Sequence, residues 1–175
     1  MTGIIPTDRL DLVPLTVKHA AEMAVVLSDA DLHTFIGGAP VGPEALRSRY
    51  ERMVAGPPDP AVSWLNWVIR LREDACLVGT VQATITPGAH GRVAEIAWVV
   101  GTRWQKRGIA TEAARALVAW LGRQPVRSVI AHIHPDHHAS AAVASAVGLV
   151  PTRHQHDGET RWERTVGGSP LTPAG

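Results

Sequence analysis

The chain has 175 residues, 45% of them hydrophobic, and a formal net charge of +1 at pH 7. This length suits one compact domain with a sizeable core. The balanced charge gives no reason to expect binding to nucleic acid or to an anionic membrane. No apolar run is long enough to cross a bilayer, and residues 1–9 lack the apolar centre of a secretion signal.

Cysteine usage points to a reducing compartment, so we expect a cytoplasmic protein. Cys76 is the one cysteine of the chain, and no internal disulfide can form. Its neighbours offer no base that would activate a thiol nucleophile, so we interpret Cys76 as a strand or core residue.

The apolar pattern and the turn residues predict the elements in chain order. The expected strands cover residues 9–15, 64–71, 77–86, 93–100, 128–133, 150–156 and 160–166. The expected helices cover residues 17–28, 43–55, 111–121 and 139–147. This order predicts a mixed sheet covered by helices. We expect residues 1–166 to form a single domain and residues 167–175, which are rich in Gly and Pro, to form a flexible tail.

The stretch Gln-Lys-Arg-Gly-Ile-Ala-Thr-Glu, residues 105–112, lies between a predicted strand and a predicted helix. The first N–H groups of such a helix have no partner, and the helix dipole is positive there, so the turn suits a pyrophosphate. Gly108 lets a ligand approach the backbone, and Ala110 keeps the next position small. Lys106 and Arg107 add positive charge.

The spacing Gln-x-x-Gly-x-Ala is neither the Gly-x-Gly-x-x-Gly dinucleotide loop nor the P-loop. It resembles the acyl-CoA pyrophosphate loop of the GNAT superfamily of N-acetyltransferases, Gln/Arg-x-x-Gly-x-Gly/Ala. The element order over about residues 9–166 resembles the GNAT fold as well. The resemblance implies an α/β (mixed α+β) fold with one mixed, mostly antiparallel sheet of about seven strands and about four flanking helices. It also implies that acetyl-CoA is bound by the strand end and loop residues Trp98, Val99, Val100, Gln105, Lys106, Arg107, Gly108, Ile109, Ala110 and Thr111.

A second match lies in residues 135–140, Pro-Asp-His-His-Ala-Ser, followed by a helix and Gly148. The branch that acetylates the N-termini of ribosomal proteins carries Asn-x-x-Ser, a helix and Gly-Phe here. Ser140 matches the serine, and the resemblance implies that it protonates the leaving thiolate. His137 stands where asparagine is usual and can still offer one hydrogen bond to the pantetheine arm. The alternative role of Ser140 is capping of the helix N-terminus.

Amine acetylation needs a group that takes a proton from the amine. Glu95 lies mid-strand, where a charged side chain is costly unless it faces a wet cleft, and it matches the position of a glutamate that serves the amine in relatives. The alternative is an exposed strand face or an ion pair. A backbone N–H near Val99 or Val100 is the implied oxyanion donor, again by resemblance.

Further residues are candidates for the acceptor site. Phe35 and Trp67, or Trp64 in its place, are candidates for lining an amine pocket, but we favour core packing for each of them. The segment that caps the cleft in relatives carries three carboxylates, Glu44, Glu51 and Asp59. We interpret them as solvated helix charges, with attraction of a cationic amine as the alternative.

Four histidines lie close together in the sequence: His132, His134, His137 and His138. They lack the spacing of a known metal site, so we favour structural or substrate-contact roles for them and expect no metal.

The sequence therefore predicts an acetyltransferase that moves an acetyl group from acetyl-CoA to a primary amine by direct attack in a ternary complex. The acceptor is a protein or peptide N-terminus or a small amine, and the protein is a monomer or a homodimer. The alternative is an acyl-CoA-binding sensor or interaction module with little turnover. A general binder of nucleotide phosphates is disfavoured because the nucleotide motifs are missing.

Overall fold

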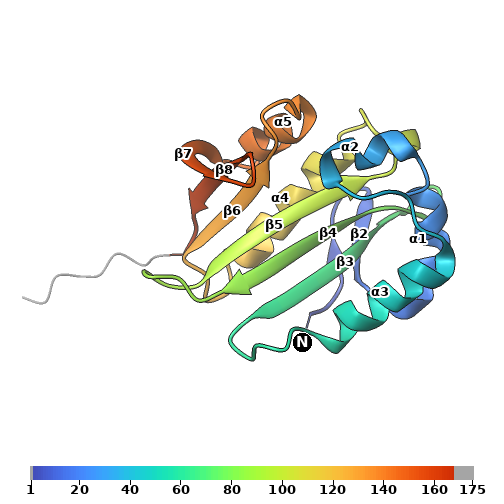
Figure 1. Cartoon of the computed structure of the whole chain (residues 1–175), viewed down its shortest axis with the longest axis horizontal. Coiled ribbons are helices and arrows are strands. Elements are labelled where there is room, and N and C mark those ends of the chain that lie inside the picture. The colour runs from blue at the N-terminus through green and yellow to red at the C-terminus, as the bar shows by residue number, and fades with distance from the viewer. Residues whose placement is uncertain (1, 168–175) are drawn as a thin grey trace, which may run out of the picture.

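The computed structural model describes residues 2–167, in which eight strands form one sheet (Figure 1). The order across the sheet is β1-β2-β3-β4-β5-β6-β8-β7. Neighbouring strands are antiparallel except for β5 and β6, which are parallel. The strands are β1 (Ile5–Pro6), β2 (Leu10–Pro14), β3 (Ser63–Leu71), β4 (Cys76–Thr86), β5 (Val93–Val100), β6 (Ser128–Ile133), β7 (Val150–His156) and β8 (Glu159–Thr165).

Helices cover both faces of the sheet, as Figure 1 shows. Two of them, α1 and α3, pack with each other and share one cluster of buried residues on one face. The opposite face carries α4 and α5, whose buried residues belong to the larger cluster. Within residues 2–167 the α-helices are α1 (Ala20–Val26), α2 (His33–Ile36), α3 (Pro43–Ala55), α4 (Ile109–Leu121) and α5 (His138–Ala146).

The helix α4 forms because its apolar residues recur at helical spacing, which gives one face that can be buried. The residues of that face, all at most 5% exposed, are Ile109, Ala113, Ala114, Leu117, Val118 and Leu121. Burial of several aliphatic side chains at roughly 1.5–3 kcal/mol each fixes this helix on the sheet. Its N-terminus therefore has a fixed position relative to β5, the strand that precedes it.

The strand β3 shows why the sheet has two apolar faces. Val68 packs into the cluster under α1 and α3, whereas its neighbours Trp67 and Ile69 pack into the cluster under α4. Successive side chains of a strand point to opposite faces, and both faces are covered here, so the strand reads as a continuous apolar run.

The pairing of β5 with β6 is short. Only Val93, Ala94 and Glu95 pair with β6, opposite Ser128 to Ile130. Beyond Glu95 the two strands are not paired with each other, although each continues for several residues. The edge of β5 from Ile96 to Val100 is therefore left open on the β6 side, next to the start of α4.

The predicted mixed, mostly antiparallel sheet with helices on its faces is confirmed. Two short elements add to it, the two-residue strand β1 and the four-residue helix α2. In residues 2–167 the structure has no helix that is long and apolar enough to span a membrane. The predicted tail lies outside the described residues except for Gly167.

Candidate active site

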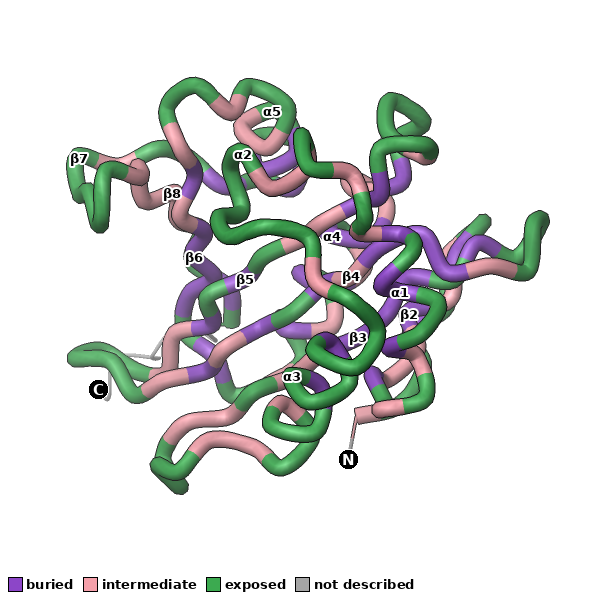
Figure 2. The backbone as a smooth tube through the Cα atoms, turned by 45° about the vertical axis from the view of Figure 1, so that its right-hand side comes forward, coloured by how far each residue is buried: buried purple, intermediate pink, exposed green. Residues whose placement is uncertain are grey.

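A cavity of about 300 Å³ lies where β5 and β6 are no longer paired. One wall is β5, from Glu95 to Val99, and the other is β6 with the start of α5. Phe35 and Ile36 of α2 also line it, and both are more than a third exposed. The largely exposed α2 segment (Figure 2) therefore forms one rim of the cavity.

The predicted pyrophosphate loop has the backbone expected of an anion site. Gly108 is the N-cap of α4 and has a left-handed backbone, with φ of 77°. Lys106 also has positive φ, 60°. The loop is exposed from Gln105 to Gly108, and the first N–H groups of α4 have no partner within the helix. Unpartnered N–H groups at the positive end of a helix favour a phosphate.

Two sets of contacts hold this loop. The Gln105 side-chain amide donates to the backbone oxygen of Val100 over 3.0 Å, which joins the loop to the end of β5. On the other side, Arg9 donates to the Glu112 carboxylate at 2.8 Å and to the backbone oxygen of Arg107 at 3.0 Å. Thr7 donates a further hydrogen bond of 2.6 Å to Glu112. The first turn of α4 is thereby tied to the segment that leads into β2.

These contacts act on the protonation of Glu112. Partial burial of the carboxyl group raises its pKa, but the hydrogen bonds from Thr7 and Arg9 and the charge of Arg9 outweigh this effect. The pKa of Glu112 therefore lies below its ordinary value. The carboxylate neutralises Arg9 and leaves Lys106 and Arg107 as exposed positive charges on the loop.

Glu95 lines the cavity, and its side chain is 49% exposed. Its carboxylate lies 2.7 Å from Nδ1 of His132, which is on β6 and also lines the cavity. Glu95 was expected to face a water-filled cleft, and its half-exposed side chain in the cavity agrees with this expectation. The sequence did not identify His132 as its partner.

Ser140, in the first turn of α5, lines the cavity on the β6 side. Its hydroxyl oxygen lies 3.3 Å from Nε2 of His137, and the His137 ring stacks on Phe35 with centroids 4.3 Å apart. Burial lowers the pKa of His137, and the nearby His134 lowers it further. The neutral imidazole is therefore favoured near neutral pH.

Not all of the predicted site residues lie at the cavity. Trp98 and Val99 line it. The side chains of Val100 and Ile109 are buried in the core, so these residues have only their backbone to offer a ligand. Trp67 is fully buried, lies edge-on to Trp120 at 5.4 Å and donates to the backbone of Gly3. Its predicted contact with the amine is wrong, because a side chain without exposed surface cannot reach a substrate.

Three carboxylates that were weighed as attractors of the amine lie away from the cavity, in agreement with their default interpretation as solvated charges. Glu44, Glu51 and Asp59 are exposed and are not among the residues that line the cavity. Glu51 pairs with Arg47 one helical turn away, as solvated helix charges usually do. The acidic side chain that does line the cavity besides Glu95 is Glu159, at the start of β8.

Three polar residues of the cavity were missed by the sequence analysis: Thr80, Gln82 and Glu159. Thr80 and Gln82 lie on β4 opposite Val99 and Ala97 of β5. They alternate with the buried Val81 and Ala83 along β4. Because side chains alternate between the two faces of a strand, this pattern indicates that Thr80 and Gln82 share the less buried face. Nothing in the local sequence around Glu159 identified it, because β8 reaches the cavity only through its pairing with β6.

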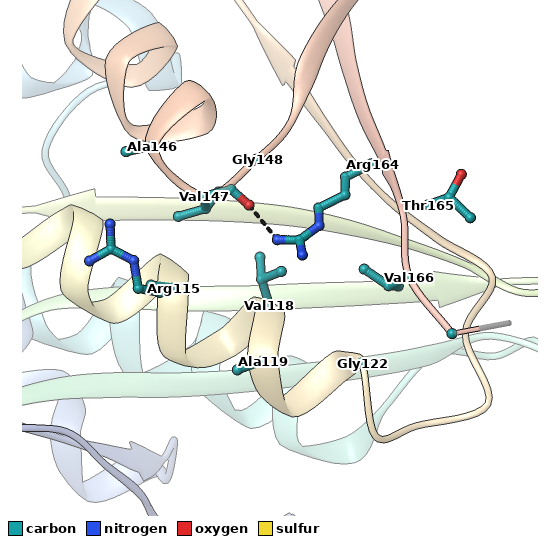
Figure 3. Close-up of a pocket in the computed structure, with 11 residues that line it drawn as sticks. Arg115, Val118, Ala119, Gly122, Ala146, Val147, Gly148, Arg164, Thr165 and Val166 are labelled. Carbon is teal, nitrogen blue, oxygen red and sulfur yellow. Dashed lines mark hydrogen bonds between the residues drawn. The ribbon is translucent and has the colours of Figure 1, made fainter. Parts of the chain in front are cut away.

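A larger cavity of about 800 Å³ lies on another part of the molecule, between α4, the end of α5 and β8 (Figure 3). Its titratable lining residues are Arg115 and Arg164, and Arg164 donates to the backbone oxygen of Val147 over 2.8 Å. It contains neither a carboxylate nor a histidine among the described residues and lies apart from the loop. The smaller cavity, which adjoins the open edge of β5, is therefore the candidate active site.

The histidines of residues 132–138 do not form a cluster of metal ligands in the part of the chain that is described. Among residues 2–167, no group of three or more histidine, cysteine, aspartate or glutamate side chains is close enough together to hold a metal ion. The histidines of the segment 132–138 instead contact Glu95, Phe35 and Ser140.

Comparison with known proteins gives a family match over most of the chain. The acetyltransferase (GNAT) domain family matches residues 9–150. These residues include the loop, Glu95, His132 and the start of α5. No curated protein sequence gives a significant match.

Solved structures with the same fold extend over nearly the whole chain. One is RimL, a ribosomal L7/L12 alpha-N-protein acetyltransferase in complex with coenzyme A, at 18% identity and a TM-score of 0.78, covering 93% of this chain and 98% of that one. Another is the ribosomal-protein-S5-alanine acetyltransferase of Vibrio fischeri, at 16% identity and a TM-score of 0.76, covering 93% and 96%. A third is the microcin C7 self-immunity acetyltransferase MccE in complex with acetyl-CoA and AMP, at 16% identity and a TM-score of 0.73, covering 91% and 94%.

Proposed function

Because the chain belongs to the GNAT family of acetyltransferases, we propose that it transfers the acetyl group of acetyl-CoA to a primary amine by direct attack in a ternary complex. The observation that carries the proposal is the open edge of β5 between the anion-binding loop and the cavity that contains Glu95 and Ser140. Acetyl-CoA has phosphates at one end and a thioester at the other. It therefore fits the spatial order of the anion-binding loop, the open edge of β5 and the cavity.

The phosphates of acetyl-CoA would lie at the N-terminus of α4, on the N–H groups after Gly108 and beside Lys106 and Arg107. The pantetheine arm would run along the unpaired edge of β5, with Trp98 and Val99 beside it and His137 across the cavity. This arrangement would bring the thioester between the two strands.

In the cavity the amine nitrogen would attack the thioester carbonyl carbon as it loses a proton. Glu95 supports that proton transfer, as its position at the wet end of the cavity suggests. A backbone N–H near Val99 stabilises the negative charge that develops on the carbonyl oxygen. Collapse of the tetrahedral intermediate breaks the carbon–sulfur bond, and the hydroxyl of Ser140 supplies the proton for the thiolate.

The acceptor that we propose is an amine that enters as a cation, since Glu95 and Glu159 both line the cavity. Phe35 and Ile36 offer apolar surface at the rim for the group next to the amine. The N-terminus of a protein or peptide and a small amine both meet this description. The named activities of RimL and of the Vibrio fischeri protein on ribosomal proteins favour the first.

Thermal unfolding with and without acetyl-CoA tests the first half of the proposal, that the protein binds acetyl-CoA. A ligand at about 100 times its Kd adds about 2.7 kcal/mol to the stability of the folded state. For a chain of this length that corresponds to a rise in Tm of about 5–10 °C. We expect this rise with acetyl-CoA and not with ATP or NAD.

A panel of amines tests the second half, that the acetyl group is transferred to an amine. The quantity measured is the free CoA released. The panel contains short peptides with a free N-terminus, polyamines and amino acids. Binding of acetyl-CoA without CoA release on any amine would leave a binding module and contradict the proposed transfer. No shift with millimolar acetyl-CoA would contradict both halves.

A further inference from the structure

The contact between Glu95 and His132 joins two strands just where their pairing ends. Glu95 is the last residue of β5 that pairs with β6, and His132 lies two residues beyond its partner Ile130. The carboxylate oxygen Oε1 and the ring nitrogen Nδ1 are 2.7 Å apart, and both side chains line the cavity. Of all the histidines that line the cavity, His132 is the one that contacts the proposed active-site carboxylate.

The hydrogen bond determines which nitrogen of the ring is free. An ionised carboxylate accepts hydrogen bonds and donates none, so Nδ1 of His132 carries the proton and donates to Glu95. In the neutral ring Nε2 then has the free lone pair. Among the described residues Nε2 has no hydrogen-bond partner, and it is not one of the buried atoms left without one. Nε2 is therefore open to the solvent of the cavity.

The two side chains differ in exposure in a way that suits a base and its support. The ring of His132 is held between the strands with 14% of its side chain exposed, whereas Glu95 is 49% exposed. A ring fixed by a neighbouring carboxylate keeps its tautomer and orientation, and the carboxylate stabilises the imidazolium that forms when the ring takes a proton. An imidazole also titrates much closer to neutral pH in general, near 6.5, than a glutamate does, near 4.3.

We infer that Nε2 of His132 takes the proton of the acceptor amine and that Glu95 acts through this ring as a positioning residue. The inference rests on the proposed function and assigns one of its steps. Nε2 first takes one proton from the ammonium group, and the nitrogen lone pair that this frees forms the new bond to the acetyl carbon. The carbon–sulfur bond then breaks, the thiolate takes the proton of the Ser140 hydroxyl, and Ser140 regains a proton from the nitrogen of the new amide. The imidazolium then returns its proton to solvent at the mouth of the cavity.

Several other charged or titratable groups surround the His132 ring and can influence how the reaction rate depends on pH. The ring of His156 on β7 lies with its centroid 5.4 Å from that of His132. Arg161 is the residue paired with His132 on β8 and is itself within 3.5 Å of Glu163. Glu159 and His134 line the same cavity.

The test is the pH dependence of kcat/KM for amine acetylation in four forms of the full chain: wild type, His132→Gln, Glu95→Gln and the control His90→Gln. His90 is exposed in the turn before β5 and is not part of the cavity. In the wild type kcat/KM should rise with pH through an ionisation in the imidazole range. We expect His132→Gln to lose this rise and about 100-fold or more of the rate, since general base catalysis contributes about 10²–10⁴-fold.

Glu95→Gln should lower the rate but keep the rise of kcat/KM with pH, because the ring that takes the proton is still present. Added imidazole should restore part of the rate of His132→Ala and none of the rate of Glu95→Ala. A purely structural role of His132 would show neither effect. Unchanged stabilisation by acetyl-CoA shows that each variant is folded.

The opposite pattern would overturn the inference: His132→Gln keeps the ionisation, and Glu95→Gln abolishes it. Glu95 would then be the base, and the proposed function would still stand. If the wild type bound acetyl-CoA but acetylated no amine, the proposed function would fail, and the inference with it.

Discussion

A side-chain carbon on Gly79 would lie 2.1 Å from the backbone oxygen of Val99. No residue but glycine fits this place on β4, because real Cβ atoms do not approach a backbone oxygen so closely. Gly79 pairs with Val100 in the sheet, so the close approach lies on the β4 side of the same β5 segment whose other edge, toward β6, is open. It thereby permits the path of β5 on which the proposed pantetheine site depends.

Gly79→Ala should move the end of β5 or destabilise the sheet. Overpacking in a filled core costs about 1–3 kcal/mol and sometimes more. We expect a Tm lowered by several degrees and weaker binding of acetyl-CoA, both measured by thermal unfolding with a titration of the ligand. Gly3→Ala is the control, since a Cβ there meets nothing within 4 Å. A stable Gly79→Ala variant with the affinity of the wild type would contradict the account.

Gly108→Ala tests the loop. Its left-handed backbone, with φ of 77°, costs a residue with a side chain about 1 kcal/mol, and the added methyl group would lie 3.5 Å from the guanidinium of Arg9, which holds the loop. Gly158→Ala is a matched control with φ of 80° and open space around the new carbon. Calorimetric titration should show at least about tenfold weaker binding of acetyl-CoA for Gly108→Ala only. Equal affinities of the two variants would exclude the loop as the phosphate site.

Ser140→Ala tests the proton donor for the thiolate. The substitution removes the hydroxyl that lines the cavity, and we expect kcat to fall about 10–100-fold with little change in KM for acetyl-CoA. Ser145→Ala on the same helix is the control, because Ser145 is exposed and not part of the cavity. If both variants lost the same small amount of Tm and no activity, Ser140 would have no part in the chemistry.

His137 stands where the ribosomal-protein branch carries an asparagine. Replacing His137 with asparagine is therefore a rescue experiment. His137→Ala removes both the stack on Phe35 and the polar nitrogen, so acetyl-CoA should bind more weakly by about three- to tenfold. His137→Asn returns a polar group without the ring. Recovery of the affinity in His137→Asn would indicate a hydrogen bond to the pantetheine arm, whereas equal losses in both variants would indicate that the ring stack holds α2 in place.

Glu112 predicts a pH dependence of stability. Its pKa in the folded state is lowered, so the carboxylate stabilises the fold fully above the pKa of the unfolded state, ordinarily about 4.5, and this contribution is lost as the pH falls through the lower folded pKa. We expect Glu112→Gln to be less stable than the wild type by about 1–2 kcal/mol at neutral pH. The difference should vanish in acid.

Urea unfolding at a series of pH values measures this difference. Glu51→Gln is the control, because its exposed pair with Arg47 should contribute almost nothing at any pH. A difference between wild type and Glu112→Gln that stayed constant down to the lowest pH would show that the charge of Glu112 does not support the loop.

The sequence predicted those features that depend on local patterns. The loop from Gln105 to Thr111 was visible because glycine, small and basic residues stand at fixed distances between a strand and a helix. The apolar face of α4 was visible from its helical spacing. β1 and α2 were not predicted, because two or four residues carry no periodicity.

Features that depend on pairing between distant strands could not be predicted from the sequence. Glu95 was selected as a charged residue within a strand, but its contact with His132 depends on the register of β5 against β6, which no local pattern encodes. Trp67 was kept as a pocket candidate beside its favoured core role because both faces of β3 are covered, so alternation did not distinguish a cavity from the core.

The most direct test of the central claim is acetyl transfer itself, followed by mass spectrometry of the acceptor together with free CoA. Wild type, Glu95→Gln and His132→Gln are incubated with acetyl-CoA and the amine panel. The account predicts one acetyl group on the amine for each CoA released by the wild type, with a rate at least about 100-fold lower for His132→Gln. CoA release without an acetylated amine, or equal rates in wild type and both variants, would contradict it.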